Sequence, residues 1–444
     1  MSNPEQPLPA GGHGRELVAL IEIEHTTVSR FVVRLLMVFF LTAIAVVPIA
    51  EVAMARVRPD ESIADAWTNL SNIPGNVRSA LAHAADSSLW QRIVSINRIA
   101  LTGLSGFERA LENESFIGRT LRPPAQLLMT SWLGAGNERV YPGHDGWVFY
   151  RQDVEYITSP GFLDPAQIRR RIAAAPEWTN PPQPDPREAI VQFKRDLDTR
   201  GITLVVMPAP LKPGVHPEML ARRYTDVAGI LQNPSYRAFV DDLRRNGVLV
   251  FDPSQALAAA RGSGPQYLAT DTHWRPETME SVAGLAGDFV LAHAALPVID
   301  DPGYRIERVE VRSRGDIARM LDLPGEAALF PPEAVWLRRV LQPDGSVWRS
   351  SREADVLLLG DSFSNIYSLE SMGWGTSAGL AEQLSYSLRR PVDRLTQNDQ
   401  GSFATRAMLQ RDPSRLDRKR VVIYQFAVRE LADGDWKVLP IPNH

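Results

Sequence analysis

The sequence contains no cysteine among its 444 residues. Disulfide bonds, thiolate catalysis and zinc sites built on cysteine are therefore excluded. The cellular compartment stays open, because a chain of this size can fold around its core without disulfides even in an oxidising space. The sequence also lacks a basic block and any interleaving of aromatic with basic residues, and its net charge is only −4. Nucleic acid is therefore not expected as a partner.

What is present is typical of a globular protein, with 44% hydrophobic and 23% charged residues. The length allows one large domain or two of ordinary size. From about residue 140 onward, short apolar runs alternate with amphipathic segments. The pattern predicts helices over 187–200, 236–245 and 277–295 and within 372–389, and strands over 202–207, 248–251, 356–359 and 421–426. This alternation favours an α/β fold whose parallel sheet is covered by helices on both faces.

One long apolar run lies near the N-terminus. Residues 35–50 carry no charge, and the wider segment 31–55 is long enough to cross a bilayer as a helix. We favour an uncleaved signal anchor over a buried helix of a soluble protein. A cleaved signal peptide is the other alternative, because Ala53-Met54-Ala55 has the form of a cleavage site. Against cleavage, the region before the apolar run is unusually long and contains several glutamates.

The charges around this segment bear on its orientation. Arg30 and Arg34 favour a cytoplasmic N-terminus, whereas Arg56 and Arg58 on the other flank weaken that signal. The first residues are rich in proline and glycine and are predicted to be disordered. Residues after the anchor carry helical periodicity without strand signals. We therefore expect a cytoplasmic tail, a transmembrane anchor, a helical linker region and a catalytic domain over residues 1–30, 31–55, 56–139 and 140–444.

Two short stretches carry the chemistry. Residues 271–274 read Asp-Thr-His-Trp, and residues 360–364 read Gly-Asp-Ser-Phe-Ser. Together they supply a carboxylate, an imidazole and a hydroxyl. A serine becomes nucleophilic at neutral pH when a base takes its proton and a third group orients that base. If the two stretches meet in space, acyl transfer is the chemistry they predict.

The local sequence supports these roles and leaves alternatives open. Ser362 follows a predicted strand at a turn into a helix, where its backbone N–H could stabilise an oxyanion. An ordinary helix cap is the other interpretation of this serine. Asp271 and His273 are two residues apart, so in an extended segment both point to one face. The same pair could bind a metal, but no further cluster of ligands accompanies it, and we predict no metal site.

The parallel sheet also brings loops together. Ligands of such folds bind at the carboxyl ends of the strands. The proline-rich loop 208–217 leaves the first predicted strand at that edge, and Ser362 leaves the third. Lys212 and His216 lie on this loop and are therefore candidate substrate contacts.

Five motifs in order resemble the alginate O-acetyltransferase branch (the AlgJ/AlgX-like family) of the SGNH hydrolase-like superfamily. Ordinary SGNH hydrolases place the serine first and the aspartate and histidine last, whereas this branch and this chain invert that order. The matching segments are the aromatic entry 146–150, the proline-rich loop 208–217, the Asp-x-His at 271–273, the Gly-Asp-Ser-Phe-Ser at 360–364 and the closing segment 429–436.

The resemblance implies an SGNH hydrolase-like three-layer α/β/α domain that faces the periplasm and acetylates an exopolysaccharide. It assigns Ser362 as nucleophile, His273 as general base and then acid, and Asp271 as the orienting carboxylate. Asn365 and Tyr367, within one turn of Ser362, are candidate oxyanion contacts. No cofactor is expected, because a periplasmic domain would not meet acetyl-CoA. A membrane-bound O-acyltransferase of the inner membrane is the implied acetyl donor.

The sequence departs from the family at position 216, where histidine replaces a frequent tyrosine, and no carbohydrate-binding module is expected after the catalytic domain. The acceptor is expected to be alginate or a related exopolysaccharide, cellulose-like polymers included. Two alternatives stay open. The same three residues would serve a carbohydrate acetyl esterase if water reached the acyl-enzyme. A non-catalytic scaffold of a polysaccharide secretion complex is the third hypothesis, although a scaffold has no need of all three residues.

Overall fold

The computed structural model describes residues 29–442 apart from 58–63, 84–87, 176–179 and 326–328. Nearly all of the predicted N-terminal tail lies outside these residues. The chain divides into two compact units, Met1–Arg122 and Pro123–His444. Helix α5 (Phe116–Leu133) crosses the division.

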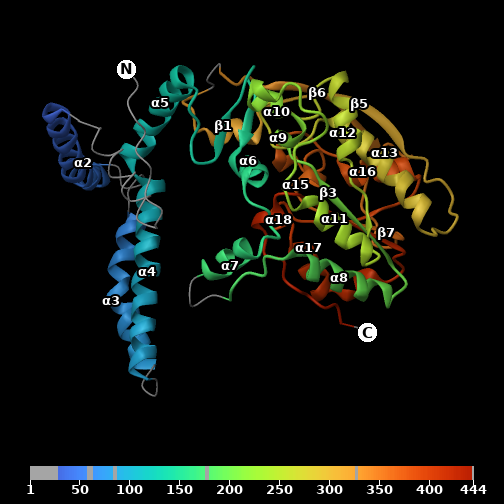
Figure 1. Ribbon diagram of the computed structural model, residues 1–444, viewed down its shortest axis with the longest axis horizontal. Coiled ribbons are helices and arrows are strands. Elements are labelled where there is room, and N and C mark those ends of the chain that lie inside the picture. Colours follow the sequence, from blue (N-terminus) through green and yellow to red (C-terminus); the bar gives the residue numbers. More distant parts are fainter. Residues whose placement is uncertain (1–28, 58–63, 84–87, 176–179, 326–328, 443–444) are drawn as a thin grey trace, which may run out of the picture. The chain divides into compact units, whose positions relative to one another are not determined.

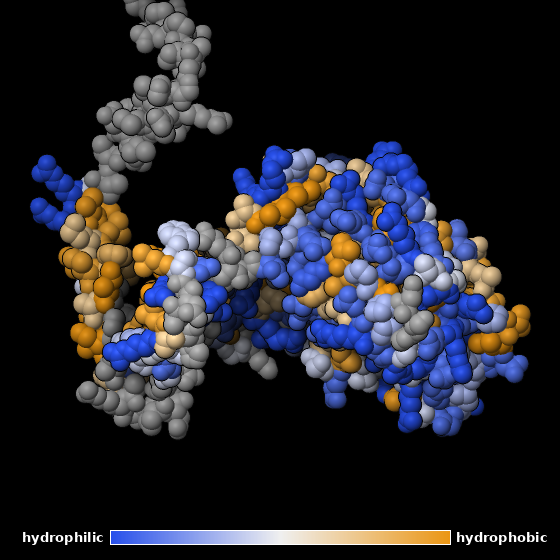
Figure 2. All heavy atoms as spheres, turned by 90° about the horizontal axis from the view of Figure 1, so that it is seen from below, coloured by the Kyte–Doolittle hydropathy of each residue, from blue (hydrophilic) through white to orange (hydrophobic). Residues whose placement is uncertain are grey.

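The first unit begins with the apolar helix α2 (Arg30–Val57). Its residues Arg30–Glu51 have a mean hydropathy of 2.5. Within the described residues this is the one helix long and apolar enough to cross a membrane. Apolar side chains cover its exposed surface, which is seen as an orange column in Figure 2. A helix that exposes its apolar residues in this way is suited to lipid rather than to water.

Glu51 ends the apolar stretch of α2 and is buried. Its carboxylate accepts hydrogen bonds from Ser115 Oγ at 2.6 Å, Phe116 N at 3.1 Å and Ile117 N at 2.9 Å. These donors belong to the first turn of α5, where backbone N–H groups have no partner inside the helix. Glu51 therefore fastens the end of α2 to the start of α5.

Helices α3 (Ala64–His83) and α4 (Leu89–Glu114) form an antiparallel hairpin in the same unit (Figure 1). The rings of Trp67 and Phe107 lie 5.7 Å apart between them. A side chain at Gly103 would come within 2.4 Å of Ile73, so glycine allows the two helices to approach closely there. The helical linker predicted from periodicity corresponds to these helices.

The second unit is built on a five-stranded parallel sheet in the order β4-β3-β9-β7-β8. Nearly every residue of the three central strands is buried, as expected for strands covered on both faces. The apolar runs predicted as strands therefore form the sheet. The strands are β3 (Thr203–Ala209), β4 (Leu249–Val250), β7 (Val356–Gly360), β8 (Asp393–Thr396) and β9 (Val421–Ala427).

The predicted helices cover this sheet. Helices α8 (Pro186–Asp198) and α11 (Tyr236–Arg245) contact each other and the strands β3 and β4, and α13 (Pro276–His293) packs against α16 (Leu380–Leu388). Helix α8 shows why the local sequence forms a helix. Asp185 accepts a hydrogen bond from Arg187 N at 3.0 Å, Pro186 occupies the first position, and Phe193 and Leu197 face the core.

Two pieces of the second unit were not predicted. Strand β8 adds an edge to the sheet, and β5 (Arg305–Ser313) pairs with β6 (Glu333–Leu341) in an antiparallel hairpin. The aromatic entry forms β2 (Val148–Tyr150), which pairs with β1 (Val140–Pro142). The remaining helices are α6 (Arg151–Thr158), α7 (Pro165–Ala173), α9 (Lys212–Val215), α10 (Pro217–Leu220), α12 (Ser254–Ala260), α14 (Asp316–Met320), α15 (Ser362–Asn365), α17 (Ala404–Arg411) and α18 (Glu430–Asp433).

Candidate active site

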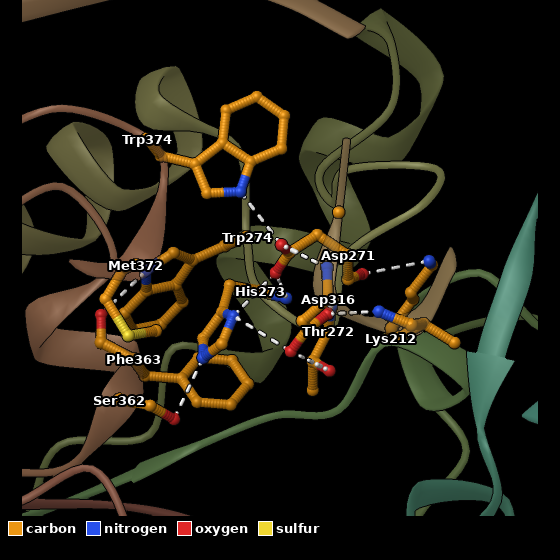
Figure 3. Close-up of polar contacts among 12 residues, drawn as sticks. Lys212, Asp271, Thr272, His273, Trp274, Asp316, Ser362, Phe363, Met372 and Trp374 are labelled. Carbon is orange, nitrogen blue, oxygen red and sulfur yellow. Dashed lines mark hydrogen bonds and ion pairs between the residues drawn. The ribbon is translucent and has the colours of Figure 1, made fainter. Parts of the chain in front are cut away.

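Two segments meet at the carboxyl edge of the sheet. We call residues 269–274 the histidine loop and residues 360–365 the serine turn. The serine turn leaves β7 directly and enters α15, and the loop that contains Lys212 leaves β3 at the same edge. The histidine loop precedes α13. Figure 3 shows Ser362, His273 and Asp271 in one line of contacts.

The side chains of these two segments form a continuous hydrogen-bonded chain. Ser362 Oγ lies 2.9 Å from His273 Nε2, and His273 Nδ1 lies 2.7 Å from Asp271 Oδ1. Asp271 and His273 are only 1% and 2% exposed, while Ser362 retains 8%. This is the geometry in which an imidazole takes a proton from a serine hydroxyl while a carboxylate fixes its tautomer.

The electrostatics of the pair suit a base. Burial by itself would lower the pKa of His273, but the hydrogen bond to Asp271 and the charge of that carboxylate raise it above its ordinary value. Burial would raise the pKa of Asp271, but the hydrogen bond and charge of His273 hold it well below its usual range. Trp374 Nε1 at 2.8 Å and the Asp316 N–H at 3.0 Å also donate to Asp271 Oδ2. Asp271 therefore stays ionised beside the imidazole.

Charged side chains from three other parts of the chain hold the histidine loop. Lys212 Nζ donates to the carbonyls of Val148 at 2.6 Å, Ala269 at 2.7 Å and Asp271 at 3.0 Å. The Glu333 carboxylate accepts from the backbone N–H groups of residues 269 and 270 and from a threonine hydroxyl. Asp316 accepts from residue 272 in the same way. The positive lysine thus binds backbone carbonyls, and the two negative carboxylates bind backbone N–H groups.

The serine turn is held mainly by its own neighbours. Asp361 caps α15 by accepting from Phe363 N at 2.9 Å, and its second oxygen accepts from the N–H of Ala427 at the end of β9. Gln425 donates to Asp361 Oδ1 at 2.8 Å and accepts from Ser364 Oγ at 2.5 Å. Both partners lie on β9, the strand beside β7. The cap role considered for Ser362 is therefore filled by Asp361, which leaves the Ser362 hydroxyl to His273.

The structure brings the predicted Asp271, His273 and Ser362 together, but it corrects the expectation for Lys212. This lysine is 0% exposed, and complete burial lowers its pKa to about 8. Its ammonium donors are engaged by three backbone carbonyls. Lys212 therefore positions the histidine loop and does not face a substrate.

The other predicted contacts are likewise engaged inside the protein. His216 is buried between Glu218 at 2.9 Å and the N–H of Gln266 at 2.9 Å. Tyr367 donates its hydroxyl to Trp274 O at 2.7 Å and has no exposed surface. These two side chains were expected to contact substrate or an oxyanion, and both instead hold the core around the site.

Asn365 is also buried, and its Nδ2 donates to Asn398 Oδ1 at 2.7 Å. Its Oδ1 has no hydrogen-bond partner in the described part of the chain. Asn398 therefore occupies one of the two N–H groups of the Asn365 amide. The oxyanion role of Asn365 stays a prediction.

Three further residues contact Asp271 or the loop and were not predicted, namely Trp374, Asp316 and Glu333. Each reaches the histidine loop from a distant part of the sequence, and two lie at the start of an element, α14 or β6. No local pattern marked them. The pairing of β5 with β6 carries Asp316 and Glu333 back to the loop, whereas Trp374 lies between β7 and α16.

A metal centre is the competing interpretation of this cluster, because Asp271, His273 and Asp316 offer atoms within 4.8 Å of one another. Each of their carboxylate oxygens, however, already accepts from a protein N–H or O–H group. The His273 nitrogens bind Asp271 and Ser362. A metal would have to displace this network, so the arrangement of these side chains fits proton transfer better than coordination.

Comparison with known proteins agrees with this geometry. Residues 140–428 match the family model described as SGNH hydrolase-like domain, acetyltransferase AlgX. The chain is 25% identical over 329 residues to the probable alginate O-acetylase AlgJ of Pseudomonas aeruginosa, which covers 68% of this chain and 74% of that protein. It is 26% identical over 254 residues to the protein of the same name in Pseudomonas syringae, over 55% of this chain and 61% of the relative.

The fold is shared with a solved structure. The O-acetyltransferase domain of Pseudomonas putida AlgJ superimposes with a TM-score of 0.50 at 22% identity, over 66% of this chain and 92% of that domain. The family model alone spans well over half of the chain, including both the histidine loop and the serine turn. The chain therefore belongs to the family of SGNH hydrolase-like domains of the acetyltransferase AlgX type.

Proposed function

We propose that this protein transfers acetyl groups to hydroxyls of an exopolysaccharide through an acetyl-enzyme on Ser362. The observation that carries the proposal is the continuous contact from Ser362 Oγ through His273 to Asp271. The names of the relatives, alginate O-acetylases, make alginate or a related polymer the acceptor we expect.

In the first half-reaction, Ser362 Oγ attacks the carbonyl carbon of the acetyl donor while its proton passes to His273 Nε2. The tetrahedral intermediate collapses, the bond to the donor oxygen breaks, and that oxygen takes the proton from His273. Acetyl-Ser362 remains. Asp271 stabilises the imidazolium in between and keeps Nδ1 protonated, so that Nε2 is the basic nitrogen.

In the second half-reaction, a sugar hydroxyl gives its proton to His273 Nε2 and attacks the acetyl carbon. Collapse of the second intermediate releases the acetylated sugar, and Ser362 Oγ recovers the proton. The Ser362 N–H, which has no intrahelical acceptor at the first position of α15, is the oxyanion donor we expect.

The same three residues would serve transfer or hydrolysis, and the outcome depends on whether water or a sugar hydroxyl reaches the acyl-enzyme. Ser362 keeps a small opening to solvent, which is open to either. The names of the relatives, O-acetylases, favour transfer. An assay separates the two. With a soluble acetyl ester, added oligosaccharide should divert acetyl groups from free acetate into acetylated sugar, whereas an esterase would yield acetate in both cases.

The apolar helix α2 supports a membrane anchor. We propose that the catalytic domain lies on the periplasmic side. Such a domain has no access to acetyl-CoA, so we propose that a membrane-bound O-acyltransferase of the inner membrane supplies the acetyl group. A protease-accessibility assay on intact spheroplasts tests the orientation. Digestion of the catalytic domain without lysis is expected, and protection until lysis would contradict this topology.

The central test is Ser362→Ala. Loss of the attacking hydroxyl should lower transfer by at least about a thousand-fold, as for other serine triads. The matched control is Ser387→Ala, because Ser387 is an exposed serine of the same unit. A serine-reactive probe should label the wild-type protein and the control and fail to label Ser362→Ala. Full polymer acetylation by Ser362→Ala would overturn the proposed function.

A further inference from the structure

Asp316 contacts the two residues of the histidine loop that directly precede His273. Its carboxylate accepts from Thr272 N at 2.8 Å through Oδ1 and from Thr272 Oγ1 at 2.8 Å through Oδ2. Its own N–H donates to Asp271 Oδ2 at 3.0 Å. One residue therefore fixes the backbone just before the histidine and the far oxygen of the carboxylate that orients it (Figure 3).

The approach of this segment to the loop requires glycine at position 315. A Cβ there would lie 2.1 Å from the carbonyl oxygen of Thr270, which is backbone and cannot move aside. Gly315 N instead donates to Thr270 Oγ1 at 3.1 Å. The start of α14 is thus built to lie directly against the histidine loop, with Asp316 as its first helical residue.

Asp316 also carries charge to the imidazole. Its Oδ2 lies 4.0 Å from His273 Nδ1, next to the bond that Nδ1 makes with Asp271. The Asp316 side chain is 26% exposed, so solvent screens part of this attraction. The charge still matters, because the imidazole becomes positive each time it accepts the serine or sugar proton.

Three other charged side chains act on the same imidazole. Asp271 lies on the loop itself, Asp153 comes from α6, and Arg429 follows β9. The two acidic groups favour the imidazolium and the arginine opposes it. Asp316, on α14, is a further negative charge that favours the imidazolium. Burial together with the charge of Asp271 raises the pKa of Asp316 to about 6.

We propose that Asp316 is a second carboxylate of this site, a positioning residue that anchors the histidine loop and stabilises the His273 imidazolium by its charge. The proposal rests on the proposed function, because the imidazolium forms only if His273 acts as the base. It assigns no bond-making step to Asp316. Its two contributions, anchoring and charge, can be separated by substitution.

Asp316→Asn removes the charge but keeps an oxygen that accepts from Thr272. Without the negative charge the pKa of His273 should fall. The acid limb of the kcat/KM profile should then move to lower pH by about one unit, as expected for a charge at 4.0 Å in a partly screened site. Asp316→Ala removes the anchor as well and should lower kcat further. Asp322→Asn, an exposed carboxylate two residues beyond α14, is the matched control and should leave the profile unchanged.

The pKa of His273 is also measured directly, by NMR of the imidazole nitrogens in the full chain. This readout needs no turnover, so it separates two failures. A shift of the His273 pKa in Asp316→Asn together with full acetylation by Ser362→Ala would remove the proposed function and leave the electrostatic coupling. A folded Asp316→Asn protein with an unshifted His273 pKa and an unshifted acid limb would overturn the inference. A shift of both supports it.

Discussion

The histidine loop and the serine turn supply one site but are held in different ways. Opposite charges from distant elements, Lys212, Glu333 and Asp316, bind the backbone of the histidine loop. Neighbours on the adjacent strand hold the serine turn, chiefly the neutral amide of Gln425. The nucleophile is therefore placed by the regular sheet, whereas the base depends on hydrogen bonds from charged side chains that are distant in the sequence.

The largest effect that would test this comparison is expected from Lys212→Met. The substitution removes the lysine donor from the carbonyls of Val148 and Asp271, whereas the Ala269 carbonyl keeps its hydrogen bond from Val148 N. Each unsatisfied group costs about 1–3 kcal/mol, so we expect the free energy of unfolding to fall by about 4 kcal/mol, measured by denaturant titration. Lys437→Met, at a partly exposed lysine, should change it little. A loss of unfolding free energy no larger than that of the control would mean that the Lys212 contacts contribute nothing to stability.

Gln425→Leu tests the serine turn and should have a smaller effect. The substitution removes a donor to Asp361 and an acceptor for the backbone N–H of the same residue and for Ser364 Oγ. Leucine fills much of the space, so we expect a loss of about 2 kcal/mol in the free energy of unfolding. The loss should be independent of salt, because no ion pair is broken. A strongly salt-dependent loss would erase the distinction between the two segments.

The pH profile gives the smallest and sharpest comparison. His273 must be neutral to accept the serine proton, and its raised pKa places the acid limb of kcat/KM above the ordinary 6.5. Activity should therefore fall as the pH drops through that raised value, while Asp271 stays ionised. The limb should stay in place in Gln425→Leu, since that residue touches only the serine turn. A wild-type limb at or below pH 6.5 would contradict the assigned base.

Much of this architecture could be predicted because its signals are local. Continuous apolar runs such as 202–207 and 421–426 mark strands buried on both faces. Strand β8 gave no such signal. Its Asp393 is buried, where Arg415 and Lys419 bind it at 2.6 Å and 3.3 Å, so a tertiary ion-pair network replaces the apolar pattern.

The residues of the site also differ in whether a local sequence signal marks them. The spacing of Asp271 and His273 and the position of Ser362 after a strand could be recognised in the sequence. Asp316 and Glu333 could not, because their roles arise only when β5 and β6 return the chain to the histidine loop. Lys212 was noticed for its place on the loop, but its complete burial follows from packing that no local pattern records.

Glu51 has a consequence for how the protein would sit in a bilayer. The apolar stretch before it is about 30 Å long as a helix, which equals the thickness of the hydrocarbon core. Its carboxylate accepts hydrogen bonds from the start of α5, which joins α2 to α5 just beyond the apolar stretch. A thinner bilayer that tilts α2 would therefore turn this junction with it, and hydrophobic mismatch would act on the helices outside the membrane.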